Sequence, residues 1–171
     1  MDRSTSAAST SHLDFEGFYA ANVGAITAQI RAYVGDLPEA EDLVAEAFCR
    51  ALARWQTIRA YDNPAVWVRR VAWNLATSKL RRGAVLRRIL LRQRPAHIEG
   101  PQPDRIDLEQ ALSELKPRHR KAVILHYLAG MTTPEIAEQE GVADVTVRSW
   151  LARGRTALAK RLRIDAFEEQ Q

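Results

Sequence analysis

The sequence predicts an all-α fold made of two small helical domains joined by a flexible basic linker, the C-terminal one a helix-turn-helix. Apolar residues recur every three or four positions along most of the 171 residues, which is the period of an amphipathic helix. Glycine and proline number only eight and seven, so helix-breaking residues are sparse. No segment shows the strict alternation of a half-buried strand. The predicted organisation is a disordered tail (1–11), a first domain (12–82), a linker (83–103), a second domain (104–163) and a short tail (164–171).

Two helices are predicted in the first half of the first domain. The first carries apolar residues at helical spacing over 15–30 and ends near Gly35. The second starts at an acidic N-cap, Asp36, with Glu39 three residues on. Its apolar stripe reaches Trp55 and is the clearest in the chain.

The third predicted helix follows a loop over 57–63. Asn63 and Pro64 mark its start, Asn as the N-cap and Pro at the first helical position. The helix runs to about Arg82, and a short helix is possible over 85–91. Arg94-Pro95, Gly100-Pro101 and Pro103 then read as an extended linker.

The second domain resumes helical spacing near Asp104. Pro117 starts a helix that ends at Gly130, and Thr132 with Glu135 forms a capping box that opens a short helix to Glu140. A turn follows over 141–144. The last predicted helix covers 145–162.

Composition excludes several classes of protein. The longest apolar run is four residues, so no membrane span is predicted, and the first eleven residues do not resemble a signal peptide. Cytoplasmic localisation is expected. The single cysteine, Cys49, rules out an internal disulfide and is expected to be a small core residue. Four scattered histidines give no metal-binding spacing, so no metal, cofactor or catalytic site is predicted.

The charge is unevenly distributed. The net charge is +4, and 21 of the 25 cations are arginine, which matches phosphate better than lysine does. Seven cations and no acid lie over 79–94, whereas five acids and no cation lie over 36–46. This polarity predicts two different partners.

The strongest functional signal is the C-terminal helix-turn-helix. Ala137 is small where the helices cross, Gly141 takes the turn, and Val147 packs between the helices. The second helix would then enter the major groove of DNA. Its expected contacts are Asp144, Val145, Thr146, Arg148, Ser149 and Ala152 toward the bases, with Arg153 and Arg155 toward phosphates. The alternative is a plain helical hairpin with solvated arginines.

The helix over 64–82 has polar residues opposite its apolar side. These are Arg70, Asn74, Thr77 and Arg81, with Trp73 alongside. Arginines that flank an exposed aromatic ring suit single-stranded nucleic acid. The sequence leaves open whether Trp73 is such a stacking platform or a core residue.

Glu39, Asp42 and Glu46 share one face of the second predicted helix. DNA would repel this face. It is either a protein-docking face or a solvated surface, and without other context the solvated surface is favoured.

Taken together, these segments resemble the extracytoplasmic-function (ECF) sigma factors of bacterial RNA polymerase, small two-domain members of the sigma-70 family. The resemblance covers roughly 14–82 and 104–163. The segments that carry it are GDLPEAEDLVAEAFCRALARW, NPAVWVRRVAWNLATSKLRR, LSELKPRHRKAVILHYLAGMTTPEIAEQEGV and TVRSWLARGRTAL.

The resemblance implies a role for each segment. The domain over 12–82 would be sigma region 2, and that over 104–163 would be region 4. Glu39, Asp42 and Glu46 would contact core RNA polymerase. The −10 promoter element and its melted non-template strand would meet Asp62, Asn63, Arg70, Trp73, Asn74, Thr77 and Arg81. The helix-turn-helix would read the −35 element. An anti-sigma protein is a further implied partner.

The chain departs from the family pattern in two places. Ala143 stands where a serine cap often precedes the recognition helix, so capping could shift to Asp144. Trp150 replaces a frequent polar residue and is expected to be buried. The alternative function is a helix-turn-helix regulator that binds duplex DNA without carrying polymerase. An RNA-binding adaptor or an enzyme has little support.

Overall fold

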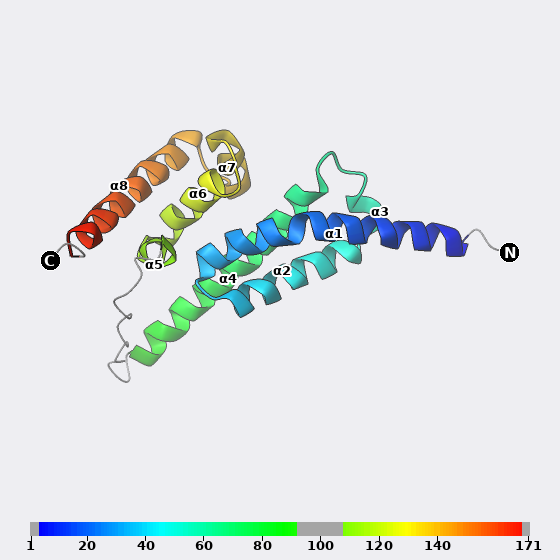
Figure 1. Ribbon diagram of the computed structural model, residues 1–171, viewed down its shortest axis with the longest axis horizontal. Helices are drawn as coiled ribbons and strands as arrows, with labels where there is room; N and C mark the ends of the chain where they lie inside the picture. The colour runs from blue at the N-terminus through cyan, green and yellow to red at the C-terminus, as the bar shows by residue number, and fades with distance from the viewer. Residues whose placement is uncertain (1–3, 92–107, 169–171) are drawn as a thin grey trace. The chain divides into compact units, whose positions relative to one another are not determined.

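A computed structural model describes residues 4–91 and 108–168, with side chains for 14–85, 108 and 110–161 (Figure 1). The described residues form helices and connecting turns, with no strand among them. They divide into two compact units, residues 4–31 with 36–79 and residues 32–35 with 80–91 and 108–168. The all-α prediction is confirmed.

The first unit is built on four helices. They are α1 (Ser4–Val34), α2 (Leu37–Leu52), α3 (Trp55–Ile58) and the first part of α4 (Pro64–Leu91), which continues into the second unit. Each helix contributes side chains to one core. They include Ile26, Ile30, Val44, Phe48, Ile58, Val68 and Ala72.

The predicted helix starts of the first unit are confirmed. Asp36 caps α2, and its Oδ1 accepts a hydrogen bond from the Glu39 N–H at 2.8 Å. Asn63 caps α4 in the same way, with its Oδ1 accepting from the Ala65 N–H at 3.1 Å. Gly35 ends α1 with a φ of +85°, which costs glycine little because it has no Cβ.

The helices are longer than predicted. The segment 1–11, predicted as a disordered tail, is helical from Ser4 because it contains no glycine or proline to stop α1. α4 does not end at Arg82 but continues through Gly83 to Leu91, since one glycine costs a helix only about 1 kcal/mol. One helical turn, α3, occupies part of the predicted loop over 57–63. The rest of the predicted linker, 92–103, lies outside the described residues.

The second unit contains α5 (Leu108–Ser113), α6 (Pro117–Tyr127), α7 (Thr133–Glu140) and α8 (Asp144–Glu168). Its core gathers apolar residues from these four helices and from the turn between α5 and α6, chiefly Leu112, Leu115, Ile124, Leu125, Ile136, Val147 and Leu151. α8 continues past the predicted end at 162, so most of the predicted C-terminal tail is helical.

The helix-turn-helix geometry is confirmed. Thr132 and Glu135 form the predicted capping box at the start of α7. Gly141 ends α7 in the left-handed region, with a φ of +66°. The N–H of the next residue, Val142, donates to the Ala137 carbonyl at 3.0 Å, which satisfies an otherwise open end of the helix. Val147 is fully buried between the helices.

Cys49 was wrongly predicted to be a core residue. It is exposed because the buried side of α2 is formed by Ala40, Val44, Ala47, Phe48 and Ala51, and at about 100° per residue Cys49 lies on the opposite side of the helix. Among the described residues, no helix is both long and apolar enough to cross a membrane.

Candidate nucleic-acid interface

The first three turns of α8, here called the recognition helix, present a sharply divided surface. Val147, Leu151 and Gly154 are buried against the rest of the second unit. Val145 is 71% exposed. Arg148, Ala152, Arg153 and Arg155 are also exposed, and Asp144, Thr146, Ser149 and Trp150 are half-buried. Arg148 therefore points outward as the sequence predicted.

Two of the exposed arginines are held by neighbours. Arg148 Nε lies 2.7 Å from Asp144 Oδ2, one helical turn earlier. Arg155 Nη1 donates to the Tyr127 hydroxyl at 3.3 Å. Tyr127 is 53% exposed at the end of α6, and the sequence reading did not single it out. Nothing local marks it, because α6 and α8 meet only in the folded unit.

The start of α8 does not use its expected cap. The helix begins at Asp144, and the carbonyl of Ala143 accepts from the N–H groups of Thr146 and Val147. Ala143 thus occupies the N-cap position without a side-chain oxygen. Capping has not shifted to Asp144, whose carboxylate instead pairs with Arg148.

The recognition helix is fixed in place by α6 and α7. His119 on α6 is buried, and burial, followed by the charges of Arg153, Lys116 and Arg118, lowers its pKa below 6.5. Lys121, also on α6, is buried and pairs with Glu140 of α7 at 2.7 Å. His126 Nδ1 lies 2.7 Å from the Met131 carbonyl. Both histidines of α6 therefore make contacts within the second unit, in agreement with the predicted structural role.

α4 presents the expected polar face. Arg70, Asn74 and Arg81 are exposed and Thr77 is half-buried. Their spacing of four, three and four residues aligns them along one side of the helix. We call these four residues the α4 polar face.

Trp73 does not belong to that face. It is fully buried, and its Nε1 donates to Gln29 Oε1 of α1 at 3.4 Å. The expectation that Trp73 is a stacking platform is wrong, and the core alternative holds. The buried side of α4 comprises Val68, Ala72, Trp73 and Ala76, with Trp67, Val71 and Leu75 only half-buried at its edge.

The loop between α3 and α4 supplies an exposed aromatic residue, which Trp73 does not. Tyr61 is 47% exposed and precedes the exposed Asp62 and Asn63. The Oδ1 of Asn63 is engaged in capping α4, which leaves its amide NH₂ as the free donor. The sequence reading missed Tyr61, although an aromatic residue in a polar loop was a visible signal.

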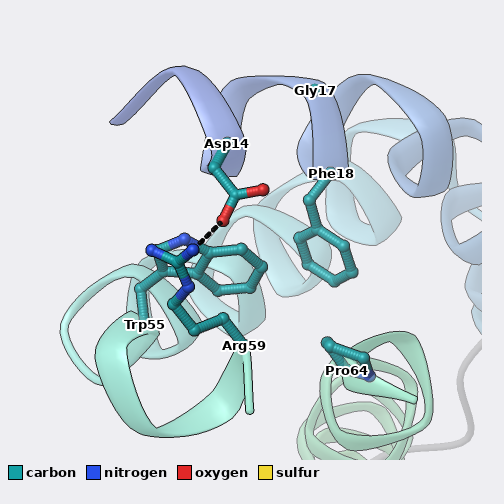
Figure 2. A pocket seen from close by; sticks show the side chains of 6 residues that line it. All are labelled: Asp14, Gly17, Phe18, Trp55, Arg59 and Pro64. Atoms are coloured by element: carbon teal, nitrogen blue, oxygen red, sulfur yellow. Dashed lines mark ion pairs between the residues drawn. The ribbon is translucent and has the colours of Figure 1, made fainter. Parts of the chain in front are cut away.

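A pocket of about 440 Å³ opens beside this loop (Figure 2). Asp14 of α1 and Arg59 at the end of α3 form an ion pair across it, with 3.3 Å between Oδ2 and Nη2. The rings of Phe18 and Trp55 line its wall, with centroids 4.8 Å apart. The ion pair ties the start of the loop to α1.

The acidic face of α2, formed by Glu39, Asp42 and Glu46, is partly neutralised within the unit. Glu39 lies 3.5 Å from Lys79 Nζ, and Glu46 lies 2.8 Å from Arg50 Nε. Asp42 is exposed and has no ion pair within the described part of the chain. It lines a groove between α1 and α2 whose rim includes Tyr19 and Leu37, 39% and 41% exposed.

Metal chemistry finds no support among these surfaces. In the part of the chain that the structure describes, no three His, Cys, Asp or Glu side chains gather as a metal site would require. The surfaces instead suit binding: a cationic helix end, a polar helix face and an acidic face, on two separate units.

Comparison with known families and structures agrees with this division. The family described as "Sigma-70 region 2" matches residues 18–85, and "Sigma-70, region 4" matches residues 105–158. The fold is similar to the sigma factor RpoE in its complex with the anti-sigma factor NepR from Bartonella quintana, with a TM-score of 0.69 and 24% identity over 89% of this chain and 98% of that one. It is also similar to CnrH in complex with the cytosolic domain of CnrY, with a TM-score of 0.62 and 22% identity over 88% of both chains.

Named relatives match along most of the chain. The RNA polymerase sigma-E factor of Streptomyces coelicolor is 30% identical over 88% of this chain and 86% of its own length. The ECF RNA polymerase sigma factor SigE of Mycolicibacterium smegmatis is 32% identical over 80% of this chain and 57% of its own length. The two matched regions, in this order and on two helical units, establish that the chain belongs to the sigma-70 family and is an ECF RNA polymerase sigma factor.

Proposed function

We propose that this sigma factor divides transcription initiation among three of its surfaces. The acidic face of α2 binds core RNA polymerase. The loop before α4 and the α4 polar face capture the melted non-template strand of the −10 element. The recognition helix reads the −35 element in duplex DNA.

The observation that carries this proposal is the division of the recognition helix into a buried and an exposed side. An apolar side chain, Val145, and a cation, Arg148, stand exposed in its first turns, while Val147 and Leu151 hold the helix to the second unit. A thymine methyl group suits an apolar contact, and a guanine edge suits arginine. Arg153 and Arg155 follow one and two turns later, where a helix lying in the groove diverges toward phosphates.

Strand capture is supported by the chemistry of α4 and its preceding loop. Single-stranded DNA requires cations for its phosphates and a ring on which a base can stack. Arg70 and Arg81 supply exposed cations, and Tyr61 supplies the exposed ring in place of the buried Trp73. Asn74 and Thr77 add donors and acceptors for base edges.

Polymerase docking is supported by Asp42. Its carboxylate is exposed and unpaired among the described residues, whereas its two acidic neighbours have partners at 3.5 and 2.8 Å. Basic residues of a partner could therefore pair with Asp42 without breaking an ion pair within the first unit. The groove beside it, with Tyr19 and Leu37 on its rim, adds apolar area at the same place.

The proposed mechanism is differential binding, and the chain performs no chemistry of its own. Binding the melted strand better than the duplex lowers the free energy of the open complex. The polymerase then forms the phosphodiester bonds. An anti-sigma protein is the proposed regulator, by analogy with the similar sigma factor RpoE, whose structure is a complex with the anti-sigma factor NepR. The proposed place of action is the cytoplasm, where polymerase and promoter meet.

Run-off transcription with core polymerase on a genomic DNA library tests the proposal. A sigma factor produces discrete transcripts that core polymerase alone does not. The alternative, a helix-turn-helix regulator without polymerase binding, predicts no sigma-dependent transcript and no co-migration with core polymerase in gel filtration. The matched region 2 argues against that alternative, because a simple regulator does not need it.

A further inference from the structure

The ion pair between Asp144 and Arg148 lies at the leading end of the recognition helix. Arg148 Nε is 2.7 Å from Asp144 Oδ2. The side chain of Arg148 is 68% exposed and that of Asp144 34%. Asp144 is the only partner of the Arg148 guanidinium among the described residues. The ion pair therefore engages the Nε side of the guanidinium, and its two terminal NH₂ groups point away from this contact.

We propose that Asp144 is a positioning residue that presents Arg148 to a single guanine of the −35 element. This inference rests on the proposed function of the recognition helix. The two free NH₂ groups form the planar fork that donates to guanine O6 and N7. A free arginine must lose its rotamer freedom when it binds, whereas Asp144 has already restricted Arg148 before DNA arrives.

The charge of Asp144 adds a second effect. A long, flexible arginine beside DNA can reach a phosphate as readily as a base, and a phosphate contact carries no sequence information. A carboxylate 2.7 Å from Arg148 Nε repels phosphate and partly neutralises the cation. Asp144 thus disfavours the phosphate contact more than the contact with an uncharged guanine.

Asp144 also lies in the first turn of α8. Any carboxylate at this position interacts favourably with the helix dipole and so stabilises the helix. That structural effect is separable from positioning. Asp144 Oδ1 is buried and has no hydrogen-bond partner among the described residues, so the side chain does not cap the helix. A serine at the N-cap position, Ala143, would supply a cap without reaching Arg148.

The experiment is selection of promoters with a randomised −35 region, using the full chain bound to core polymerase. The chains compared are wild type, Arg148→Ala, Asp144→Ala, the Asp144→Ala/Arg148→Ala double variant, and Ala143→Ser/Asp144→Ala. Wild type is expected to select guanine at one position, and Arg148→Ala to lose that selection by a factor of about 5 to 150. Asp144→Ala is expected to lose most of it as well.

Two further readouts separate positioning from folding. Asp144→Ala should bind a duplex without the −35 element more tightly than wild type, and its log affinity should fall more steeply with log salt, by up to about one unit. Adding Ala143→Ser should restore thermal stability but not the selection of guanine. In the Arg148→Ala background, Asp144→Ala should change base selection no further.

Each contrary result has its own meaning. Normal guanine selection by Asp144→Ala, with loss in Arg148→Ala, overturns the positioning role and leaves the proposed function intact. Recovery of selection in Ala143→Ser/Asp144→Ala also overturns it, because helix stability alone would then explain the loss. If Arg148→Ala selects the wild-type motif, Arg148 reads no base and the inference falls together with that part of the proposed function.

Discussion

Gly154 of α8 lies so close to Val123 of α6 that a Cβ built on the glycine would stand 2.7 Å from Val123 Cγ2. The carbonyl oxygen of His119 would be 3.5 Å from the same Cβ. Real Cβ atoms do not approach a carbon that closely. The packing of α8, which carries the recognition helix, against α6 therefore depends on the absence of a side chain at Gly154.

Gly154→Ala is expected to destabilise the second unit. Overpacking of this kind costs about 1–3 kcal/mol, against roughly 1 kcal/mol gained in helix propensity. Binding of the recognition helix to the −35 element should weaken as the second unit loses stability. Hydrogen exchange of the full chain, followed separately for α6 and α8 and for the first unit, measures the change.

Gly83→Ala is the matched control for that substitution. Gly83 also lies inside a helix, α4, but nothing lies within 4 Å of a Cβ built there. This variant should gain up to about 1 kcal/mol in local stability. Similar effects at the two glycines would contradict the close-packing argument.

Trp73→Ala and Tyr61→Ala are expected to fail in different assays. Trp73 is fully buried, so its truncation should cost about 3–5 kcal/mol of folding free energy in the first unit. Tyr61 is half-exposed on the loop, so its truncation should spare stability but weaken base stacking by about 1–3 kcal/mol. Denaturant unfolding and permanganate footprinting of the open promoter separate the two effects.

The stacking role of Tyr61 would be contradicted by one result. If Tyr61→Ala opens promoters as wild type does, the loop holds no stacking platform. Tyr61→Phe keeps the ring and should behave as wild type in both assays.

Local signals were predictable from the sequence, whereas contacts between helices were not. Asp36, Asn63 and Gly141 act on neighbours within a few residues, so their roles can be read from the order of residue types. The place of Trp73 stayed open because α4 has apolar residues on more than one side. The side that is buried depends on α1, where Gln29, 44 residues away, receives the Trp73 hydrogen bond.

The functional surfaces likewise have some features that the sequence predicts and others that depend on contacts between helices. The α4 polar face and the outward side of the recognition helix follow from helical periodicity alone, and their residues are exposed or half-buried. The pairing of Arg155 with Tyr127 and the close approach at Gly154 depend on how α6 meets α8. No periodicity in a single segment encodes such a meeting.

Acid is expected to destabilise the second unit through His119. Its pKa in the folded protein is lowered from 6.5 by burial and by the nearby cations Arg153, Lys116 and Arg118. The unfolded chain therefore takes up this proton first as the pH falls. The stabilisation is fully present above about pH 6.5 and is lost as the pH falls from there through the folded pKa.

Unfolding measured at pH 7.5 and at pH 5.5 tests the role of His119. Wild type should lose stability in the second unit over this interval, and His119→Gln should lose less. Equal losses in the two proteins would show that other groups account for the pH dependence.

Asp42→Lys is expected to weaken binding to core polymerase at least tenfold while the first unit stays folded. The reversal puts a cation where the proposed partner is basic, and like charges at an interface cost several kcal/mol. Binding titrations at low and moderate salt measure the loss, which should shrink as salt rises. Glu16→Lys, an exposed reversal on α1 outside that groove, controls for the change in net charge. Equal losses in both variants would indicate a general charge effect instead of docking at Asp42.

Val145 is expected to contact a thymine methyl group in the −35 element. It is 71% exposed at the start of the recognition helix, where an apolar side chain contributes nothing to the core. Replacing thymine with uracil at the contacted position removes only the methyl group and leaves the hydrogen-bonding edge intact. Wild-type holoenzyme should bind the uracil promoter several-fold more weakly, and Val145→Ser should bind both promoters alike.

The thymine-to-uracil replacement is scanned one thymine at a time across the −35 element, and the thymine at which Val145→Ser abolishes the difference is the contact. If every thymine-to-uracil change affects wild type and Val145→Ser equally, Val145 touches no methyl group, and its exposure has another cause.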